Sequence, residues 1–229
     1  MEIVNPGKED YHMHSLNFSD GMNTIEEIVQ YSGEIGLTKI AITDHCQVHI
    51  DLRNFGRKNY YSMLDRWKNV HNNVEVKFGI EADLLNEKGD VCFDIQGFTS
   101  EIVILSSHPA PIYSGNRNKI TEGYINAIER FHDKITFIGH PCAKYFAEHI
   151  DIMELVEICN KYEIPMEFNC ANFVNERTNI DNLKVMLENA NQIYVNSDAH
   201  TLYELKTVRE IGFQYLEEMS RLKNSQRTL

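Results

Sequence analysis

Short apolar runs alternate with longer amphipathic segments along the whole chain. Seven short runs rich in β-branched residues predict strands, over residues 11–14, 39–43, 75–81, 101–106, 134–138, 165–169 and 192–196. Between them, apolar residues recur every three or four positions, as in helices that bury one face. Strands that alternate with helices predict a parallel sheet.

The helical segments carry their own start and stop signals. Thr24 and Glu27 form a capping-box pattern before an apolar stripe, and Gly36 offers a stop after it. Asp151 is a start signal for the helix predicted over 150–162. The pattern predicts further helices over 120–131, 150–162 and 182–190, a last one from 202 onward that breaks near Gly212, and a less regular one over 57–71.

Seven alternating strands and helices fit either a closed barrel or an open doubly wound sheet, because both bury apolar parallel strands. Polar residues distinguish the two: in a barrel all strand ends open on one mouth, whereas an open sheet gathers only the ends near its switch point. Six of the seven predicted strand ends carry His, Asp or Glu. This favours a distorted (β/α)7 TIM-like barrel, and the absence of a linker or repeat favours one domain over residues 1–229.

The strand ends form a set of potential metal ligands. His12 and His14 are two residues apart on one predicted strand, so they point the same way, and Asp198 and His200 repeat that spacing. Any one of these residues is unremarkable, but six of the ten histidines fall at strand ends. The full set is His12, His14, Asp20, His45, Glu81, His108, His140, Asp198 and His200.

Imidazoles mixed with carboxylates suit zinc, manganese or iron. Because the sequence has no paired cysteines, it does not predict a structural zinc site. Nine ligands exceed the needs of one ion, so we expect two or three divalent metal ions, with Glu81 bridging two of them. Such a centre lowers the pKa of bound water and clamps phosphoryl oxygens, which indicates metal-assisted hydrolysis. Asp44 points to the other strand face and is expected to support the ligands.

Composition narrows the partners. The formal net charge of −12 disfavours long nucleic acids, which require a basic surface. No apolar run is long enough to span a membrane, and the first residues lack the pattern of a signal peptide. Five scattered cysteines are typical of reduced thiols. We therefore expect a cytoplasmic protein, and the sequence leaves its oligomeric state open.

The ligand motifs resemble those of the polymerase and histidinol phosphatase (PHP) superfamily. The resemblance rests on residues 10–15, 19–21, 42–45, 79–81, 108, 139–141 and 197–200, in the family's order. It implies a trinuclear centre in which His12, His14, Glu81 and Asp198 hold one ion. Glu81, His108 and His140 would hold a second, and Asp20, His45 and His200 a third. A metal-bound hydroxide would attack phosphorus, with catalysis expected from His12, Glu81, Asp198 and His200.

The resemblance further implies a small phosphorylated substrate, with L-histidinol phosphate as the best single expectation. Arg117 and Arg177 follow the fourth and sixth predicted strands and are the candidates for phosphate binding, since arginine suits bidentate phosphate contacts. A nucleotide phosphatase or nuclease of the same family is the alternative. A non-catalytic metal-binding scaffold is a third hypothesis, disfavoured because every ligand is retained. His49 is interpreted as a surface or helix residue without partners.

Overall fold

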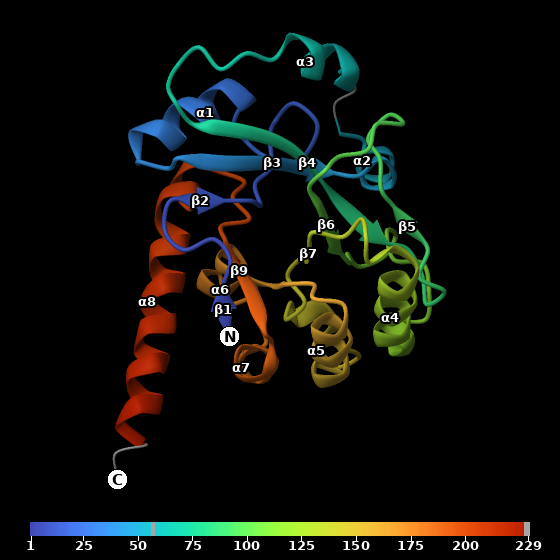
Figure 1. Cartoon of the computed structure of the whole chain (residues 1–229). Helices are drawn as coiled ribbons and strands as arrows, with labels where there is room; N and C mark the ends of the chain where they lie inside the picture. Colours follow the sequence, from blue (N-terminus) through green and yellow to red (C-terminus); the bar gives the residue numbers. More distant parts are fainter. Residues whose placement is uncertain (56–57, 227–229) are drawn as a thin grey trace.

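A curved sheet with helices around its outer side forms the protein in the computed structural model, which describes residues 1–55 and 58–226 (Figure 1). The strands are β1 (Glu2–Ile3), β2 (Glu9–Asp10), β3 (Lys39–His45), β4 (Glu75–Leu84), β5 (Val91–Cys92), β6 (Val103–Ser106), β7 (Phe137–Ile138), β8 (Met166–Asn169) and β9 (Gln192–Asn196). The helices are α1 (Ile25–Glu34), α2 (Gln47–Arg53), α3 (Tyr60–Arg66), α4 (Ile120–Phe131), α5 (Ile152–Lys161), α6 (Cys170–Val174), α7 (Ile180–Asn189) and α8 (Leu202–Gln226), with short 3₁₀ turns η1 (Arg117–Lys119) and η2 (Lys144–Phe146).

Neighbouring strands of the sheet follow the order β1-β9-β8-β7-β6-β4-β3-β2, and β5 pairs with β4 at the side. All of these pairs are parallel except β4 with β5. The seven strands β2, β3, β4, β6, β7, β8 and β9 therefore lie side by side in chain order. This is the α/β architecture of a distorted (β/α)7 barrel, and it confirms the predicted fold class.

The segment after β2 closes the barrel at the carboxyl ends of the strands. Met13 accepts a hydrogen bond from the Thr43 amide on one side, at 2.9 Å, and forms a parallel bridge with Ala199 on the other. The His14 amide donates to the Ala199 carbonyl at 2.9 Å. The predicted strand over residues 11–14 is thus displaced: regular pairing with β3 covers residues 9–10, because the chain then crosses toward β9.

Most helix predictions match the structure, and their start signals act as expected. Thr24 and Glu27 form a complete capping box, and the Asp151 side chain accepts from two amides at the start of α5. The predicted break near Gly212 is wrong, since α8 runs through it. A Cβ atom there would lie 2.5 Å from the Cys170 sulfur, so the glycine lets α8 approach α6 closely. Of the helix predicted over 57–71, α3 covers residues 60–66, and Arg57 lies outside the described residues.

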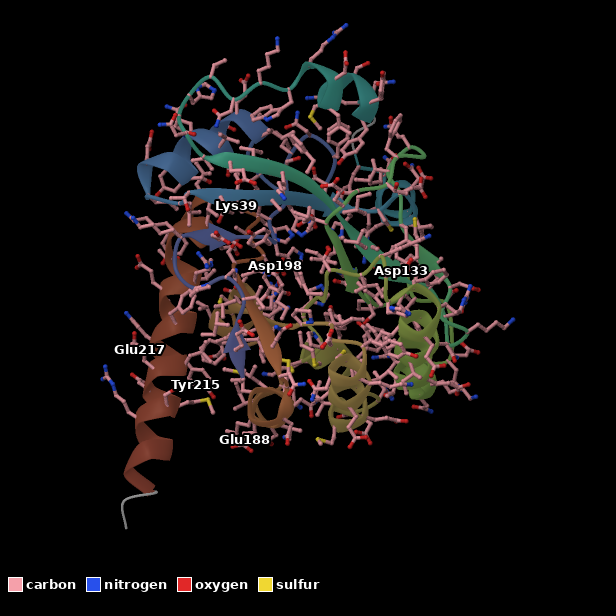
Figure 2. The ribbon with its side chains drawn as sticks, in the orientation of Figure 1. Lys39, Asp133, Glu188, Asp198, Tyr215 and Glu217 are labelled. Carbon is pink, nitrogen blue, oxygen red and sulfur yellow. The ribbon has the colours of Figure 1, made fainter. Side chains whose placement is uncertain are left out.

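Two apolar clusters hold the helices against the sheet. One joins α4, α5, α7 and α8 to the strands β6 to β9, and the other joins α1 and α2 to β3 and β4. Outside these clusters, buried strand residues include polar ones such as Thr43, His45, Glu81 and Glu167, together with the apolar Ala41, Ile104 and Phe137. None of the described helices combines the length and apolar character needed to cross a bilayer. Figure 2 shows Asp198 in the middle of the molecule, whereas Tyr215 and Glu217 lie along α8 at its side.

Candidate metal centre

A cavity of about 430 Å³ opens at the carboxyl ends of the strands. Eight of the nine predicted ligands line it, and the ninth, His12, lies beneath them with no exposed surface. Glu81 lies within the second half of β4, and each of the other side chains comes from the end of a strand or from the loop that follows it, as barrel geometry requires. The structure therefore brings all nine residues together.

The first predicted group surrounds the His12–His14 pair. Their Nε2 atoms lie 3.3 Å apart, so the two side chains point the same way. His12 Nε2 lies 3.5 Å from both Glu81 Oε1 and Asp198 Oδ1. His14 Nε2 lies 3.2 Å from Asp198 Oδ1 and 3.5 Å from Glu81 Oε2. Ligand atoms of His12, His14 and Glu81 thus all lie within 4.8 Å of one another, and Asp198 Oδ1 approaches both imidazoles.

The other two predicted groups are equally compact. Glu81 Oε1 lies 2.7 Å from His140 Nε2 and 3.7 Å from His108 Nε2. Asp20 Oδ1 lies 3.4 Å from His45 Nε2 and 3.2 Å from His200 Nε2. In each group the potential ligand atoms lie within 4.8 Å of one another, and His14 also joins the group of Asp20.

These separations suit bound cations. Two ligands at about 2.0–2.1 Å from a tetrahedral zinc ion lie about 3.4 Å apart, close to most of the distances above. Within the described part of the chain, two buried atoms of the centre, His45 Nδ1 and Glu81 Oε2, make no hydrogen bond although they lie 2.8 Å apart. Buried polar atoms in proteins are nearly always partnered, so these two fit ligands whose partner is an ion. The residues present therefore fit a divalent metal centre.

The charges of the centre are strongly coupled. Burial alone would lower the pKa of His45, but Glu81 and Asp20 outweigh it and raise that pKa to about 10. Asp20 likewise raises the pKa of His200 to about 9 against the effect of burial. Burial and the charges of His200 and His45 lower the pKa of His14 to about 3. Without cations, protons on some of these rings balance the buried carboxylates.

Two of the predicted ligands have left-handed backbone conformations. His140 has a φ of 30° and Asp198 a φ of 53°, values that non-glycine residues rarely adopt. Such strain persists only where the surrounding structure imposes it, and it concentrates at functional sites. Each residue lies two positions after the end of a strand, β7 for His140 and β9 for Asp198, where the chain turns and the side chain lines the cavity.

Buried and half-buried residues around the ligands hold them in place. Glu167 on β8 lies 2.8 Å from His12 Nδ1 and accepts from the His140 amide at 2.8 Å. Tyr145 lies with its hydroxyl 2.8 Å from His140 Nδ1. Asp44 accepts from the Ser15 amide and hydroxyl, both at 2.6 Å, which matches its expected supporting role. Partners of this kind fix the orientation of ligating imidazoles.

The two predicted phosphate-binding arginines differ in position. Arg177 lines the cavity, and its backbone is fixed by bonds of its amide to Asn172 and of its carbonyl to Lys144. The Arg117 guanidinium instead donates to the Tyr145 carbonyl at 2.5 Å, lies over the Phe146 ring, and is not among the described residues that line the cavity. Arg53, at the end of α2, lines the cavity but was not predicted.

Sequence reasoning also missed His49 and Asp83. His49 lies in helix α2, but it is only 4% exposed, lines the cavity and lies 3.2 Å from Asp83, so its interpretation as a surface or helix residue without partners is wrong. Asp83 lies two residues after Glu81 on β4, and the same-face rule that paired His12 with His14 also applies to it. No comparable spacing marks His49, which reaches the cavity only because α2 folds back over the barrel mouth.

The fold and the site together define an α/β barrel with a cluster of imidazoles and carboxylates at its mouth. The sequence matches the PHP domain family over residues 10–219, and the chain belongs to this family. This match confirms the motif resemblance.

Similar proteins carry related descriptions. A protein of Escherichia fergusonii named "Probable phosphatase YcdX" is 24% identical over 202 residues, which cover 86% of this chain and 80% of that protein. A protein of Proteus mirabilis named "Probable phosphatase PMI1003" is 26% identical over 198 residues, which cover 83% of this chain and 78% of that protein.

Among solved structures, histidinol phosphate phosphatase from Lactococcus lactis, complexed with zinc, L-histidinol and phosphate, has a TM-score of 0.52 at 15% identity. The similarity covers 89% of this chain and 92% of that one. At this identity the likeness concerns the fold.

Proposed function

We propose that this protein is a metal-dependent phosphoesterase that hydrolyses a small phosphate monoester. The observation that carries the proposal is the convergence of nine imidazole and carboxylate side chains on one cavity with an arginine, Arg177, at its rim. The names of the similar proteins support the same reaction class. L-Histidinol phosphate is the first substrate to test, because the neighbour from Lactococcus lactis is described in complex with L-histidinol and phosphate.

The proposed ligand sets are those predicted from the sequence. His12, His14, Glu81 and Asp198 would hold one divalent cation, and Glu81 would share a second with His108 and His140. Asp20, His45 and His200 would hold the third. Bound cations supply Lewis acidity and a nucleophile at neutral pH. Of these residues, His12, Glu81, Asp198 and His200 are proposed to act directly in catalysis.

The remaining polar residues bind and orient the substrate in this proposal. Arg177 presents a guanidinium to the phosphate oxygens, and Arg53 adds a second positive charge to the cavity lining. Tyr145 and Glu167 hold the His140 and His12 rings, so these rings do not turn when the substrate binds. The cavity volume of about 430 Å³ suits a small molecule and excludes a folded macromolecule.

Phosphate release from a panel of monoesters tests this proposal. Purified protein loaded with zinc or manganese is incubated with L-histidinol phosphate, nucleoside monophosphates and simple sugar phosphates. We expect release from at least one compound and its loss in the Asp198→Ala variant. Preference for the nucleotides would favour the nucleotide phosphatase alternative. No release from any compound, with metal content confirmed, would refute the proposed reaction.

A further inference from the structure

A buried carboxylate beside the predicted ligands connects two imidazoles. Asp83 has no exposed surface, and its Oδ1 lies 2.5 Å from His108 Nδ1. Its Oδ2 lies 3.2 Å from His49 Nδ1 and accepts from the Cys46 thiol at 3.3 Å. Both carboxylate oxygens of Asp83 are therefore engaged by groups that surround the cavity.

This arrangement determines where the two rings carry their protons. An ionised carboxylate only accepts hydrogen bonds, so His108 and His49 each present an N–H at Nδ1 to Asp83. A neutral imidazole protonated at Nδ1 keeps a lone pair at Nε2, which is the form that binds metal ions. Histidine ligands commonly bind a carboxylate through their other nitrogen in this way. His49 is thus prepared in the same manner as the predicted ligand His108.

The position of His49 also brings it to the centre. Its ring stacks on that of His45, with centroids 3.6 Å apart and planes 18° apart, and meets the His108 ring edge to face at 4.7 Å. Potential ligand atoms of His45, His49, Asp83 and His108 all lie within 4.8 Å of one another. Among the described residues, no hydrogen bond engages His49 Nε2, and the side chain lines the cavity.

We propose that His49 is a further metal ligand, which adds an imidazole to the edge of the centre formed by His45 and His108, and that Asp83 positions both His49 and His108. The ion at this edge is a divalent cation that accepts imidazole, with zinc as the first choice, because imidazole-rich sites suit zinc better than magnesium or calcium. This inference rests on the metal centre of the proposed function and is independent of phosphate hydrolysis.

Metal titration of the full chain tests the inference. Metal-free wild type and the His49→Gln variant are titrated with Co²⁺ followed by visible absorption, and with Zn²⁺ in competition with a chromophoric chelator. We expect His49→Gln to weaken one class of sites at least tenfold and to change the Co²⁺ spectrum. His71→Gln, at an exposed histidine outside the centre, is the matched control and should bind as the wild type does.

Asp83→Asn is the second variant. The asparagine amide has a single accepting oxygen, so it cannot accept a hydrogen bond on two oxygens as the Asp83 carboxylate does. We expect metal affinity to fall about 10- to 100-fold, as is typical for loss of a group that orients a metal ligand. Far-UV circular dichroism in chelator verifies that both variants fold.

Unchanged ion count, affinity within twofold and an unchanged Co²⁺ spectrum in folded His49→Gln would overturn the inference, as would a wild type that binds no divalent ion. If His49→Gln binds metal more weakly than the wild type, and the wild type releases no phosphate from any monoester, the inference is upheld and only the proposed reaction is refuted.

Discussion

Replacing Glu81 by glutamine removes the charge on which most of the centre converges while nearly preserving side-chain volume. Glu81 is 1% exposed, and its oxygens lie within 4 Å of five imidazoles. The individual distances run from 2.7 to 3.7 Å, to His12, His14, His45, His108 and His140. Two of the three proposed ions share this carboxylate, so the substitution should weaken two metal sites together.

The expected magnitude follows from ligand linkage. An ion at a thousand times its dissociation constant stabilises the folded state by about 4 kcal/mol per site. A change of 1 kcal/mol shifts the melting temperature of a chain of this size by about 2–4 °C, so each ion should raise it by about 8–16 °C. We therefore expect metal to stabilise Glu81→Gln by less than half as much as the wild type.

The assay is thermal unfolding of each protein in chelator and in excess Zn²⁺ or Mn²⁺, and the measured quantity is the rise in melting temperature on adding metal. Comparing rises removes any metal-independent effect of the substitution. Glu75→Gln, at the exposed start of the same strand, is the control and should show the wild-type rise. An equal rise in Glu81→Gln and wild type would refute the role given to this carboxylate.

Three further predictions test other parts of the structure. Arg177→Ala should lower kcat/KM for the phosphomonoester about 10- to 100-fold with metal content unchanged, as expected when a charged hydrogen bond is lost; an equal loss in Arg117→Ala would assign Arg117 the same role. In the wild type, Arg209 Nε lies 4.0 Å from Oδ2 of the buried Asp10. Arg209→Met removes this partner charge and should lower the free energy of unfolding in urea by about 3–5 kcal/mol; a change under about 1 kcal/mol would contradict this. Metal-free protein should lose stability as pH rises from about 6.5 to about 10, because the pKa values of His45 and His200 lie above the unfolded value of 6.5; a flat urea-unfolding profile over this range would contradict it.

The barrel was predictable because its strands and helices have different periods. The seven predicted strands correspond in order to the seven strands of the barrel, and α4 covers the range expected for it. The two-residue strands β1 and β5 were missed because, unlike β7, neither lies within a longer apolar run that predicts a strand. Gly212 shows the opposite error: a residue that weakens an isolated helix lies here where tertiary packing requires the absence of a side chain.

The predicted ligands share one cavity because strand ends in a barrel face the same mouth. His49 could not be identified in this way, since it belongs to a helix that follows β3 and its approach depends on how α2 packs. The difference between Arg177 and Arg117 was equally hidden from the sequence. Both follow a strand, but only the packing of Arg117 on Phe146 directs that guanidinium away from the cavity.

The location of bound ions tests the central claim most directly. Crystals grown with Zn²⁺ or Mn²⁺ and soaked in phosphate would show the ions by anomalous scattering at the absorption edge of the metal. We predict ions bonded to His12, His14, Glu81 and Asp198 and to the other two groups, with phosphate between them and Arg177. Crystals of metal-binding protein whose ions all lie outside these nine side chains would contradict the account.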